Sequence, residues 1–418
     1  MTSAGAAGLL TRASDRGLTS RGVSRVVAAA GALAALLFVR AAILDPRGVL
    51  PLFDLTAYQV GGQRVLGGLP LYDSPLLGAT RGVFEFVYPP FAALLFVPLA
   101  PLHGAVFVAV AVLVGVGLLV GVVWLSLIGL GLIGPGRPGR VPVSLGLGST
   151  GLLLWCEPIL ETVAFGQINL LVLVLVLADV LRPDSARSKG VLIGLAAGIK
   201  LTPLFFVLYL LVTRRFRAAA VASGAFLATV PVGAVVLPGD SRTFWAGAFA
   251  DPSRVGVPEH PGNQSLRGLI ARAWGSGSGE QLLWIASAVL FAVVGLWLAA
   301  RLAAHGRELA AAVVCGVTAT AVSPFSWVHH WVWFAPLLIL LLDRALCQRT
   351  AAAWLAWAGV AVLGAHGFFT LFGLMSAPLD APVGNLPTVV YQHGYVVLTA
   401  VLLAALARRA LSGVSPRF

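Results

Sequence analysis

The stretch that decides the fold is GAVFVAVAVLVGVGLLVGVVWLSLIGLGL, residues 104–132, which contains no charged residue. A bilayer core of roughly 30 Å is crossed by a helix of about 20 apolar residues, so this stretch is long enough to span it. A second run, residues 170–180, is apolar on every helical face, whereas membrane barrels alternate polar and apolar residues over short strands. Both runs therefore predict membrane helices rather than a barrel.

The composition of the whole chain agrees with these two runs. Of its 418 residues, 59% are hydrophobic and 11% are charged, and the mean hydropathy is +0.94. Soluble domains are about 45–50% apolar and about 25% charged, so no soluble fold buries this much apolar surface. The net charge is +12, but the basic residues lie in short loops between apolar runs, which indicates membrane orientation rather than nucleic-acid binding.

Hydropathy and helix-breaking residues predict an all-α polytopic membrane protein, one transmembrane domain over residues 1–418, with about 12 transmembrane helices. The predicted helices are 25–44, 104–132, 142–160, 168–182, 190–200, 201–213, 217–237, 282–304, 309–323, 328–343, 351–373 and 391–408. Most basic loop residues then fall on one side, which the positive-inside rule makes cytoplasmic together with both termini. We expect the plasma (inner) membrane, with membrane lipids around the chain.

The segment 190–213 is long enough for one span, but basic residues flank it at 187–189 and again at 214–217. A single span would place one of these basic groups outside the cell. We therefore predict two half-length helices that meet near Lys200 and Pro203, because proline ends a helix and restrains the residue before it. Such short helices are tolerated at membrane depth where they pack in protein or line a watery cavity.

Two large extracytoplasmic loops are predicted, at residues 45–103 and 238–281. The first carries Asp54 among apolar residues, where a carboxylate can accept a proton from a substrate hydroxyl at the membrane–water boundary. A solvated acid or a helix cap is the alternative interpretation of Asp54. Residues 87–102 are apolar but interrupted by prolines, so we expect them to lie in or dip into the interface.

Six short motifs follow Asp54 in a fixed order. They are LPLYD (69–73), YPP (88–90), GQIN (166–169), GIKLTP (198–203), NQSL (263–266) and SPFSWVHH (323–330). This order resembles the polyprenyl-phosphate-sugar-dependent glycosyltransferases of the GT-C fold. More narrowly, it resembles family 87, which includes the α-1,2-mannosyltransferases of mycobacterial phosphatidylinositol mannosides and lipomannan. The resemblance covers nearly the whole chain.

The resemblance implies an inverting transfer of mannose, with α-1,2 linkage, from polyprenyl-phosphate-mannose to a glycolipid acceptor such as a phosphatidylinositol mannoside on the outer face. Asp54 is then the general base and phosphate is the leaving group. His329 and His330 are further catalytic candidates, since one of them is placed to donate a hydrogen bond to the phosphate or the sugar. We expect no cofactor; a metal is conceivable at the two histidines, but no acidic partner lies at helical spacing, so no metal site is predicted.

Cations near the outer face are candidates for binding the donor phosphate. Lys200 is expected at the tip of the hairpin, where a charge is costly and therefore a functional candidate, with snorkelling to the interface as the equal alternative. Arg40 and Arg267 are weaker candidates, with snorkelling and solvation in a loop as the respective alternatives. The substrate-binding candidates are Tyr58, Tyr88, Gln167, Asn169, Asn263, Gln264 and Trp327. The aromatic residues among them also suit a belt at the interface.

Two other functions fit parts of the pattern. An arabinofuranosyltransferase using decaprenyl-phosphate-arabinose would share the fold and the base, and the sequence does not choose between the two sugars. A secondary transporter would also have twelve helices and half-helices near the midplane. Against the transporter stand the absence of an evident inverted repeat and the two large polar outside loops.

Overall fold

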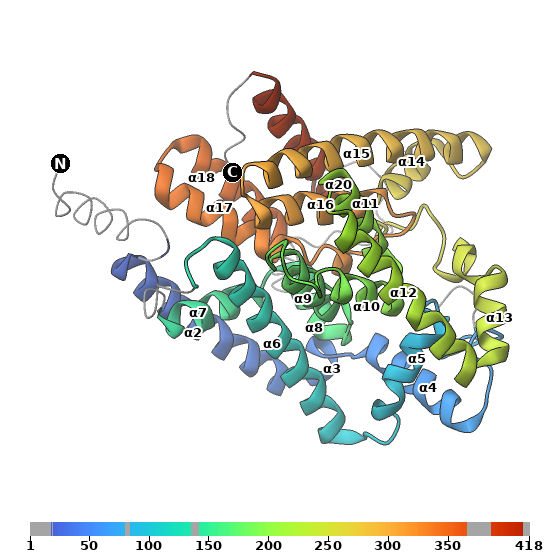
Figure 1. Ribbon diagram of the computed structural model, residues 1–418. Helices are drawn as coiled ribbons and strands as arrows, with labels where there is room; N and C mark the ends of the chain where they lie inside the picture. The colour runs from blue at the N-terminus through green and yellow to red at the C-terminus, as the bar shows by residue number, and fades with distance from the viewer. Residues whose placement is uncertain (1–17, 19, 80–83, 135–141, 366–385, 413–418) are drawn as a thin grey trace.

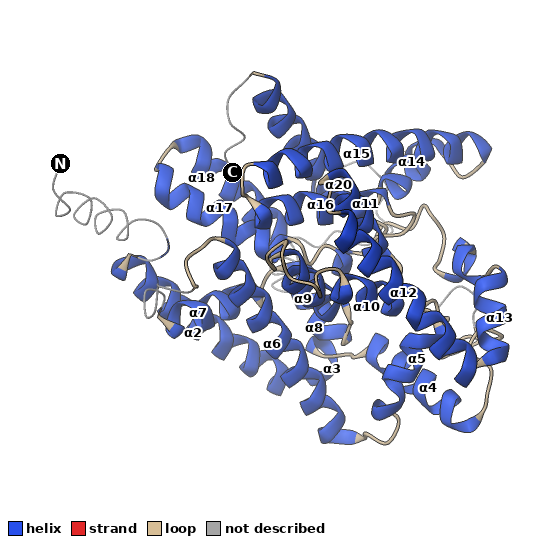
Figure 2. Cartoon of the chain, viewed as in Figure 1, coloured by secondary structure: helices blue, strands red, loops and turns tan. Residues whose placement is uncertain are grey.

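The computed structural model describes residues 18, 20–79, 84–134, 142–365 and 386–412. Within these ranges the regular structure is helical throughout, with no strand (Figure 2). Helices α8, α9 and α10 lie in the middle of the view, with α2, α6 and α7 on one side and α14, α15 and α16 on the other (Figure 1). The all-α prediction is confirmed.

Five helices of the described ranges are long and apolar enough to cross a membrane. They are α2 (Arg21–Leu44), α6 (Gly104–Gly129), α12 (Phe216–Val236), α15 (Ser278–Ala304) and the Gln392–Leu411 part of α20 (Leu386–Leu411). Shorter helices fill the rest of the expected spans: α9 (Asn169–Val180), α10 (Val191–Ile199), α11 (Phe205–Val212), α16 (Glu308–Val322), α17 (Phe334–Gln348) and α18 (Ala351–Gly364). The multi-pass character is confirmed, but the count of twelve spans is not.

The expected single helix over 142–160 is wrong. The chain instead forms α7 (Val143–Leu153) and α8 (Glu157–Phe165), which are bent by 82° at the break between them. Pro158 lies in the first turn of α8, where the backbone N–H groups have no partner within the helix. Proline, which has no N–H, is therefore tolerated at the start of a helix but not within one, so a new helix begins here.

The expected helix over 328–343 is also shifted. Its first residues form a single 3-10 turn, η6 (Val328–His330), and α17 follows only after Trp333. The last part of the expected helix 351–373 lies outside the described residues.

The predicted break at Lys200 is confirmed as a hairpin. Helix α10 ends before Lys200, the 3-10 turn η3 (Thr202–Leu204) follows, and α11 continues the chain. The carboxylate of Asp184 binds Lys189 at 2.8 Å, just before α10, and Arg215 at 3.0 Å, just after α11. Both ends of the hairpin therefore lie at one place, and Lys200 lies at its tip.

Close packing of small residues fixes α10 against α12. A Cβ added to Gly190 would lie 2.2 Å from the Ala218 carbonyl oxygen, and one at Gly194 would lie 2.3 Å from that of Ala222. A Cβ at Gly198 would likewise lie 2.6 Å from Thr229. Glycines four residues apart let membrane helices approach this closely. The residue numbers of the contacting pairs rise together along both helices, so α10 and α12 run in the same direction.

The two regions expected as outside loops are largely helical. The first contains α3 (Pro46–Val49), α4 (Phe53–Gly67), α5 (Pro90–Phe96) and η2 (Val97–Leu99). The second contains α13 (Pro238–Ala246), η4 (Ala248–Ala250), η5 (Pro252–Arg254) and α14 (Leu266–Trp274). They are joined where the Leu71 N–H donates to Asp240 at 2.7 Å and where Arg254 pairs with the buried Glu85 at 2.8 Å.

Candidate active site

Asp54 lies in the first turn of α4, not in an extended loop. The turn is fixed where the backbone N–H of Leu52, a residue with a left-handed φ of 50°, donates to the Ala164 carbonyl oxygen at 2.9 Å. Leu52 also accepts a hydrogen bond from the Thr56 hydroxyl at 2.8 Å. The start of α4 is thereby held beside the end of α8, with Asp54 half-buried at a helix N-terminus that favours an anion.

The GQIN motif packs against this first turn of α4, through Gly166 and Leu55. Gly166 ends α8 with a left-handed φ of 68°, and a Cβ there would lie 2.5 Å from the Cβ of Leu55. Glycine is therefore required both for the conformation and for the close approach. The next residue, Gln167, is brought to the Asp54 carboxylate as a side-chain hydrogen-bond partner.

Gln167 is oriented by two buried tyrosines. Its Oε1 accepts a hydrogen bond from the Tyr58 hydroxyl at 2.7 Å, and the Tyr88 hydroxyl lies 2.8 Å from that of Tyr58. The amide nitrogen of Gln167 is then its donor side, which faces His329 Nε2 at 3.4 Å as well as Asp54. These three predicted substrate-binding residues form a hydrogen-bonded group that reaches Asp54 through Gln167.

His329 is placed by contacts to its main chain. Its carbonyl oxygen accepts hydrogen bonds from Asn169 at 2.8 Å and from Thr162 at 3.1 Å. Burial lowers the pKa of His329, so the imidazole is neutral near pH 7. With Nε2 accepting from Gln167, this network assigns the ring proton to Nδ1, which lies 3.7 Å from Glu161.

Lys200 reaches the same group of residues from the hairpin tip. Its Nζ donates to the Asn169 side-chain oxygen at 2.7 Å and lies 5.9 Å from the centre of the Tyr88 ring. Burial lowers the pKa of Lys200, and the nearby Asp54 opposes that shift. Burial likewise raises the pKa of Asp54, against the opposing effects of the hydrogen bond from Gln167 and the charge of Lys200.

Segments far apart in the sequence thus bring together a carboxylate, a cation and a neutral imidazole. The cluster combines a group that can take a proton with a group that can stabilise a leaving anion. His330 adjoins it, since its ring centre lies 4.8 Å from that of His329.

Arg40 and Arg267 stand apart from these contacts. Arg40 is exposed on α2. Arg267 pairs with the buried Glu280 at 3.2 Å, and its guanidinium lies 5.1 Å from the Trp284 ring. Arg267 is therefore held in a protein ion pair rather than solvated in a loop.

Asn263 and Gln264 are fully buried and hold the SPFSWVHH segment in place. The Asn263 Oδ1 accepts from the Ser326 N–H at 3.1 Å, and the Gln264 N–H donates to the Ser326 carbonyl oxygen at 2.7 Å. Trp327, the next residue, packs edge-on against His260 at 5.0 Å between ring centres. The contacts of this motif thus position the segment that carries His329.

Several residues near the cluster were not predicted from the sequence. Thr162 binds the His329 carbonyl oxygen, and Phe165 packs edge-on against the His329 ring at 5.7 Å. The sequence signal for Phe53 was its position directly before Asp54. No sequence signal marks Arg272, whose buried guanidinium binds the carbonyl oxygens of His260 and Asn263, each at 3.0 Å.

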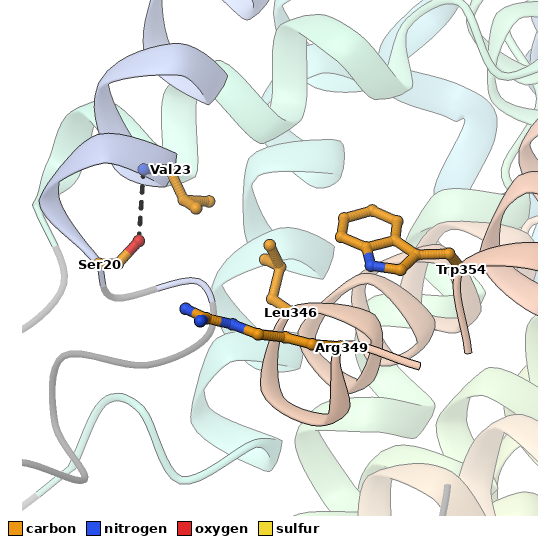
Figure 3. A pocket seen from close by; sticks show the side chains of 5 residues that line it. All are labelled: Ser20, Val23, Leu346, Arg349 and Trp354. Atoms are coloured by element: carbon orange, nitrogen blue, oxygen red, sulfur yellow. Dashed lines mark hydrogen bonds between the residues drawn. The ribbon is translucent and has the colours of Figure 1, made fainter. Parts of the chain in front are cut away.

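A hollow elsewhere on the molecule contains none of these residues. It is lined by Ser20, Val23, Leu346, Arg349 and Trp354 (Figure 3). The Ser20 hydroxyl oxygen there accepts from the Val23 N–H at 3.3 Å and caps α2. Across the described ranges, no group of three or more His, Cys, Asp or Glu side chains is arranged to hold a metal ion.

The fold is that of a multi-pass helical membrane protein, and the cluster joins a proton acceptor to a cation that can stabilise an anion. The model of glycosyltransferase family 87 matches residues 86–324. The chain therefore belongs to glycosyltransferase family 87, as its motifs predicted.

Two curated relatives are named for the same kind of reaction. The chain is 33% identical over 320 residues to a polyprenol-phosphate-mannose-dependent alpha-(1-2)-phosphatidylinositol mannoside mannosyltransferase of Mycobacterium tuberculosis, covering 74% of this chain and 75% of the relative. It is 35% identical over 315 residues to a polyprenol-phosphate-mannose-dependent alpha-(1-2)-phosphatidylinositol pentamannoside mannosyltransferase of Mycolicibacterium smegmatis, covering 74% of each. Among solved structures, ArnT from Cupriavidus metallidurans bound to undecaprenyl phosphate aligns with 91% of this chain and 73% of its own, at 16% identity and a TM-score of 0.41.

Proposed function

We propose that the protein transfers mannose from polyprenyl-phosphate-mannose to a phosphatidylinositol mannoside, forming an α-1,2 linkage with inversion at the anomeric carbon. The observation that carries this proposal is the meeting of Asp54, Gln167, Lys200 and His329, which come from four separated segments. The printed names of the relatives support the choice of donor and acceptor.

In this reaction Asp54 is the general base. The carboxylate takes the proton from the acceptor hydroxyl as its oxygen bonds to the anomeric carbon of mannose, and the bond from that carbon to the phosphate oxygen breaks. The leaving phosphate gains negative charge, which the ammonium of Lys200 stabilises. Asn169 holds the ammonium at 2.7 Å, and the neutral His329 is placed to hydrogen-bond the phosphate or the sugar.

We place this site on the outer face of the plasma membrane. The tip of the hairpin carries Lys200, while its base lies among the basic residues 182–189 and 214–217, which the positive-inside rule assigns to the cytoplasm. Labelling of single cysteines in intact cells tests this orientation, with Arg187→Cys at the hairpin base and Ser253→Cys in the second outside loop, both exposed positions. The exposed Cys347 is first replaced by serine. An impermeant reagent should label position 253 but not 187; the reverse pattern overturns the orientation.

A transfer assay tests the function itself. Purified protein is reconstituted in vesicles with polyprenyl-phosphate-mannose labelled in the sugar, with and without phosphatidylinositol mannoside. We expect label to move into a larger glycolipid only when the acceptor is present. Label that crosses the membrane still attached to the polyprenyl carrier supports a transporter and contradicts the proposal.

A further inference from the structure

Three phenylalanine rings from separate segments meet at Phe53, the residue that precedes Asp54 in the chain. The ring centre of Phe53, the first residue of α4, lies 6.0 Å from that of Phe84 and 6.2 Å from that of Phe165. Phe165 in turn meets the His329 ring at 5.7 Å, edge to face. These three rings, the Phe53 cluster, therefore extend from the turn that carries the base to the buried imidazole.

The outer rings of the Phe53 cluster are open. Phe53 is 49% exposed and Phe84 is 37% exposed, although Phe53 directly precedes the half-buried Asp54. Phe84 also has a left-handed φ of 52°, a conformation that a bulky residue rarely adopts. The surrounding structure thus holds an aromatic ring at the surface in spite of its backbone preference.

The position of the base decides what these rings face. A general base must come within hydrogen-bond reach of the hydroxyl that it deprotonates, so the acceptor sugar lies next to residues 53 and 54. The donor phosphate belongs with Lys200, whose contacts are with Asn169 and Tyr88 rather than with the Phe53 cluster. Aromatic faces carry partial negative charge and attract the C–H edges of a sugar ring.

We propose that Phe53, Phe84 and Phe165 form the platform on which the sugar ring of the glycolipid acceptor stacks while its hydroxyl faces Asp54. This inference rests on the proposed function and adds the place of the acceptor to it. The three rings set acceptor affinity, whereas Lys200 sets donor affinity.

The test replaces the aromatic face with an aliphatic side chain. Phe53→Leu and Phe84→Leu keep an apolar side chain for lipid contact but remove the surface on which a sugar stacks. The matched control is Phe249→Leu, because Phe249 is 50% exposed and its ring centre lies 6.1 Å from that of Phe244 and 6.0 Å from that of Trp245. We expect the KM for phosphatidylinositol mannoside to rise roughly 3–10-fold in the first two variants, as the loss of one aromatic contact predicts, with the donor KM and kcat within about twofold. The control should match the wild type.

Two kinetic results overturn the platform. An unchanged acceptor KM shows that these rings only face lipid, since leucine serves lipid equally well. A donor KM that rises as much as the acceptor KM assigns the rings to the polyprenyl chain instead.

Binding separates the platform from the reaction. If wild-type protein does not transfer mannose to phosphatidylinositol mannoside, the proposed function fails, and calorimetric titration with octyl α-mannoside still tests the platform. Weaker binding by Phe53→Leu than by Phe249→Leu supports it. Absent binding, or equal binding by both variants, overturns it.

Discussion

A lysine lies at each end of helix α10, and the two lysines differ in the number and charge of their hydrogen-bond partners. At the base of the hairpin, Lys189 donates to the carboxylate of Asp184 at 2.8 Å and to the carbonyl oxygens of Val180 and Arg182 at 3.0 and 2.6 Å. At the tip, Lys200 donates to the neutral side-chain oxygen of Asn169 at 2.7 Å, and the charge of Asp54 acts on it electrostatically.

The difference separates a lysine that binds only protein oxygens from the lysine that we propose to bind the donor phosphate. An ammonium has three donors, and those of Lys189 are all used by protein oxygens. Lys200 keeps its charge near a carboxylate and an imidazole without such saturation. A buried cation whose pKa is lowered is stabilised by any anion that arrives, and the proposed donor supplies a phosphate.

The largest effect is expected from Asp54→Asn. Asparagine keeps the size and the hydrogen bonding with Gln167 but takes no proton, and general-base catalysis is worth about 10²–10⁴-fold. We expect mannosyl transfer to fall to about one part in a hundred of the wild-type rate or less. Elution, melting and donor binding should stay as in the wild type.

A second aspartate provides the control for this variant. Asp45 caps the short helix α3, accepting from the Gly48 N–H at 2.9 Å, and is exposed. Asp45→Asn should transfer mannose at nearly the wild-type rate. Near-normal transfer by Asp54→Asn would remove Asp54 as the base, and Glu161, 3.7 Å from His329, would be tested next.

The next largest effect is expected from Lys200→Met. A charge-assisted hydrogen bond contributes about 1.5–3 kcal/mol, so the donor KM should rise or the turnover should fall about tenfold or more. Lys189→Met at the other end of α10 should lower the melting temperature and leave the donor KM unchanged. A normal donor dependence in well-folded Lys200→Met would show that Lys200 only reaches toward the interface.

The pH profile of transfer should reflect the ionisation of both Asp54 and Lys200. Asp54 acts when ionised, and burial raises its pKa, so the acidic limb should lie at a higher pH than for an ordinary aspartate. Lys200 acts when protonated, and burial lowers its pKa, so the rate should fall again below the pH at which an ordinary lysine loses its proton. Lys200→Arg retains the charge at any accessible pH and should move the alkaline limb upward. An alkaline limb that stays in place in this variant would assign it to another group.

The smallest effect on activity is expected from Glu308→Gln at the hairpin base. Glu308 binds Arg215 through both carboxylate oxygens, at 2.5 and 2.7 Å, with side chains 19% and 15% exposed. Loss of the charge should cost roughly 1–3 kcal/mol of stability, toward the lower end because the pair is partly exposed. Thermal denaturation should show the loss, while transfer per folded molecule stays within about twofold. A rate loss as large as that of Lys200→Met would show that the base of the hairpin controls its tip.

The hairpin was predicted from the basic residues on both sides of it, and the length of the apolar segment alone would have predicted a single span. The residues 190–213 are long enough for a span, and only the basic residues on both sides required the chain to turn back. The bend between α7 and α8 was missed because its cause is local: Pro158 lies in the first turn of α8, inside a stretch that is apolar enough to be taken for one helix.

The site was predicted in part. Asp54 was a candidate from its place in the first outside loop, and the quoted motifs supplied Gln167, Asn169, Lys200 and His329. The structure brings these five residues together. The motif around Asn263 was also quoted from the sequence, but the Asn263 side chain binds backbone groups of Pro258, Pro324 and Ser326 instead of joining the cluster. Which polar residues face one another depends on tertiary contacts such as the bond from Leu52 to Ala164, and a single sequence carries no signal for these.

The shared carboxylate at the hairpin base also sets an order of assembly. Asp184 and Lys189 emerge from the ribosome together, whereas Arg215 follows only after the whole of α10 and α11 has been made. A chain folds from its N-terminal end during synthesis, so the pair with Lys189 forms first and that with Arg215 forms last. A chain that ended between the two would have α10 and the pair with Lys189, but neither the returning helix α11 nor the pair with Arg215.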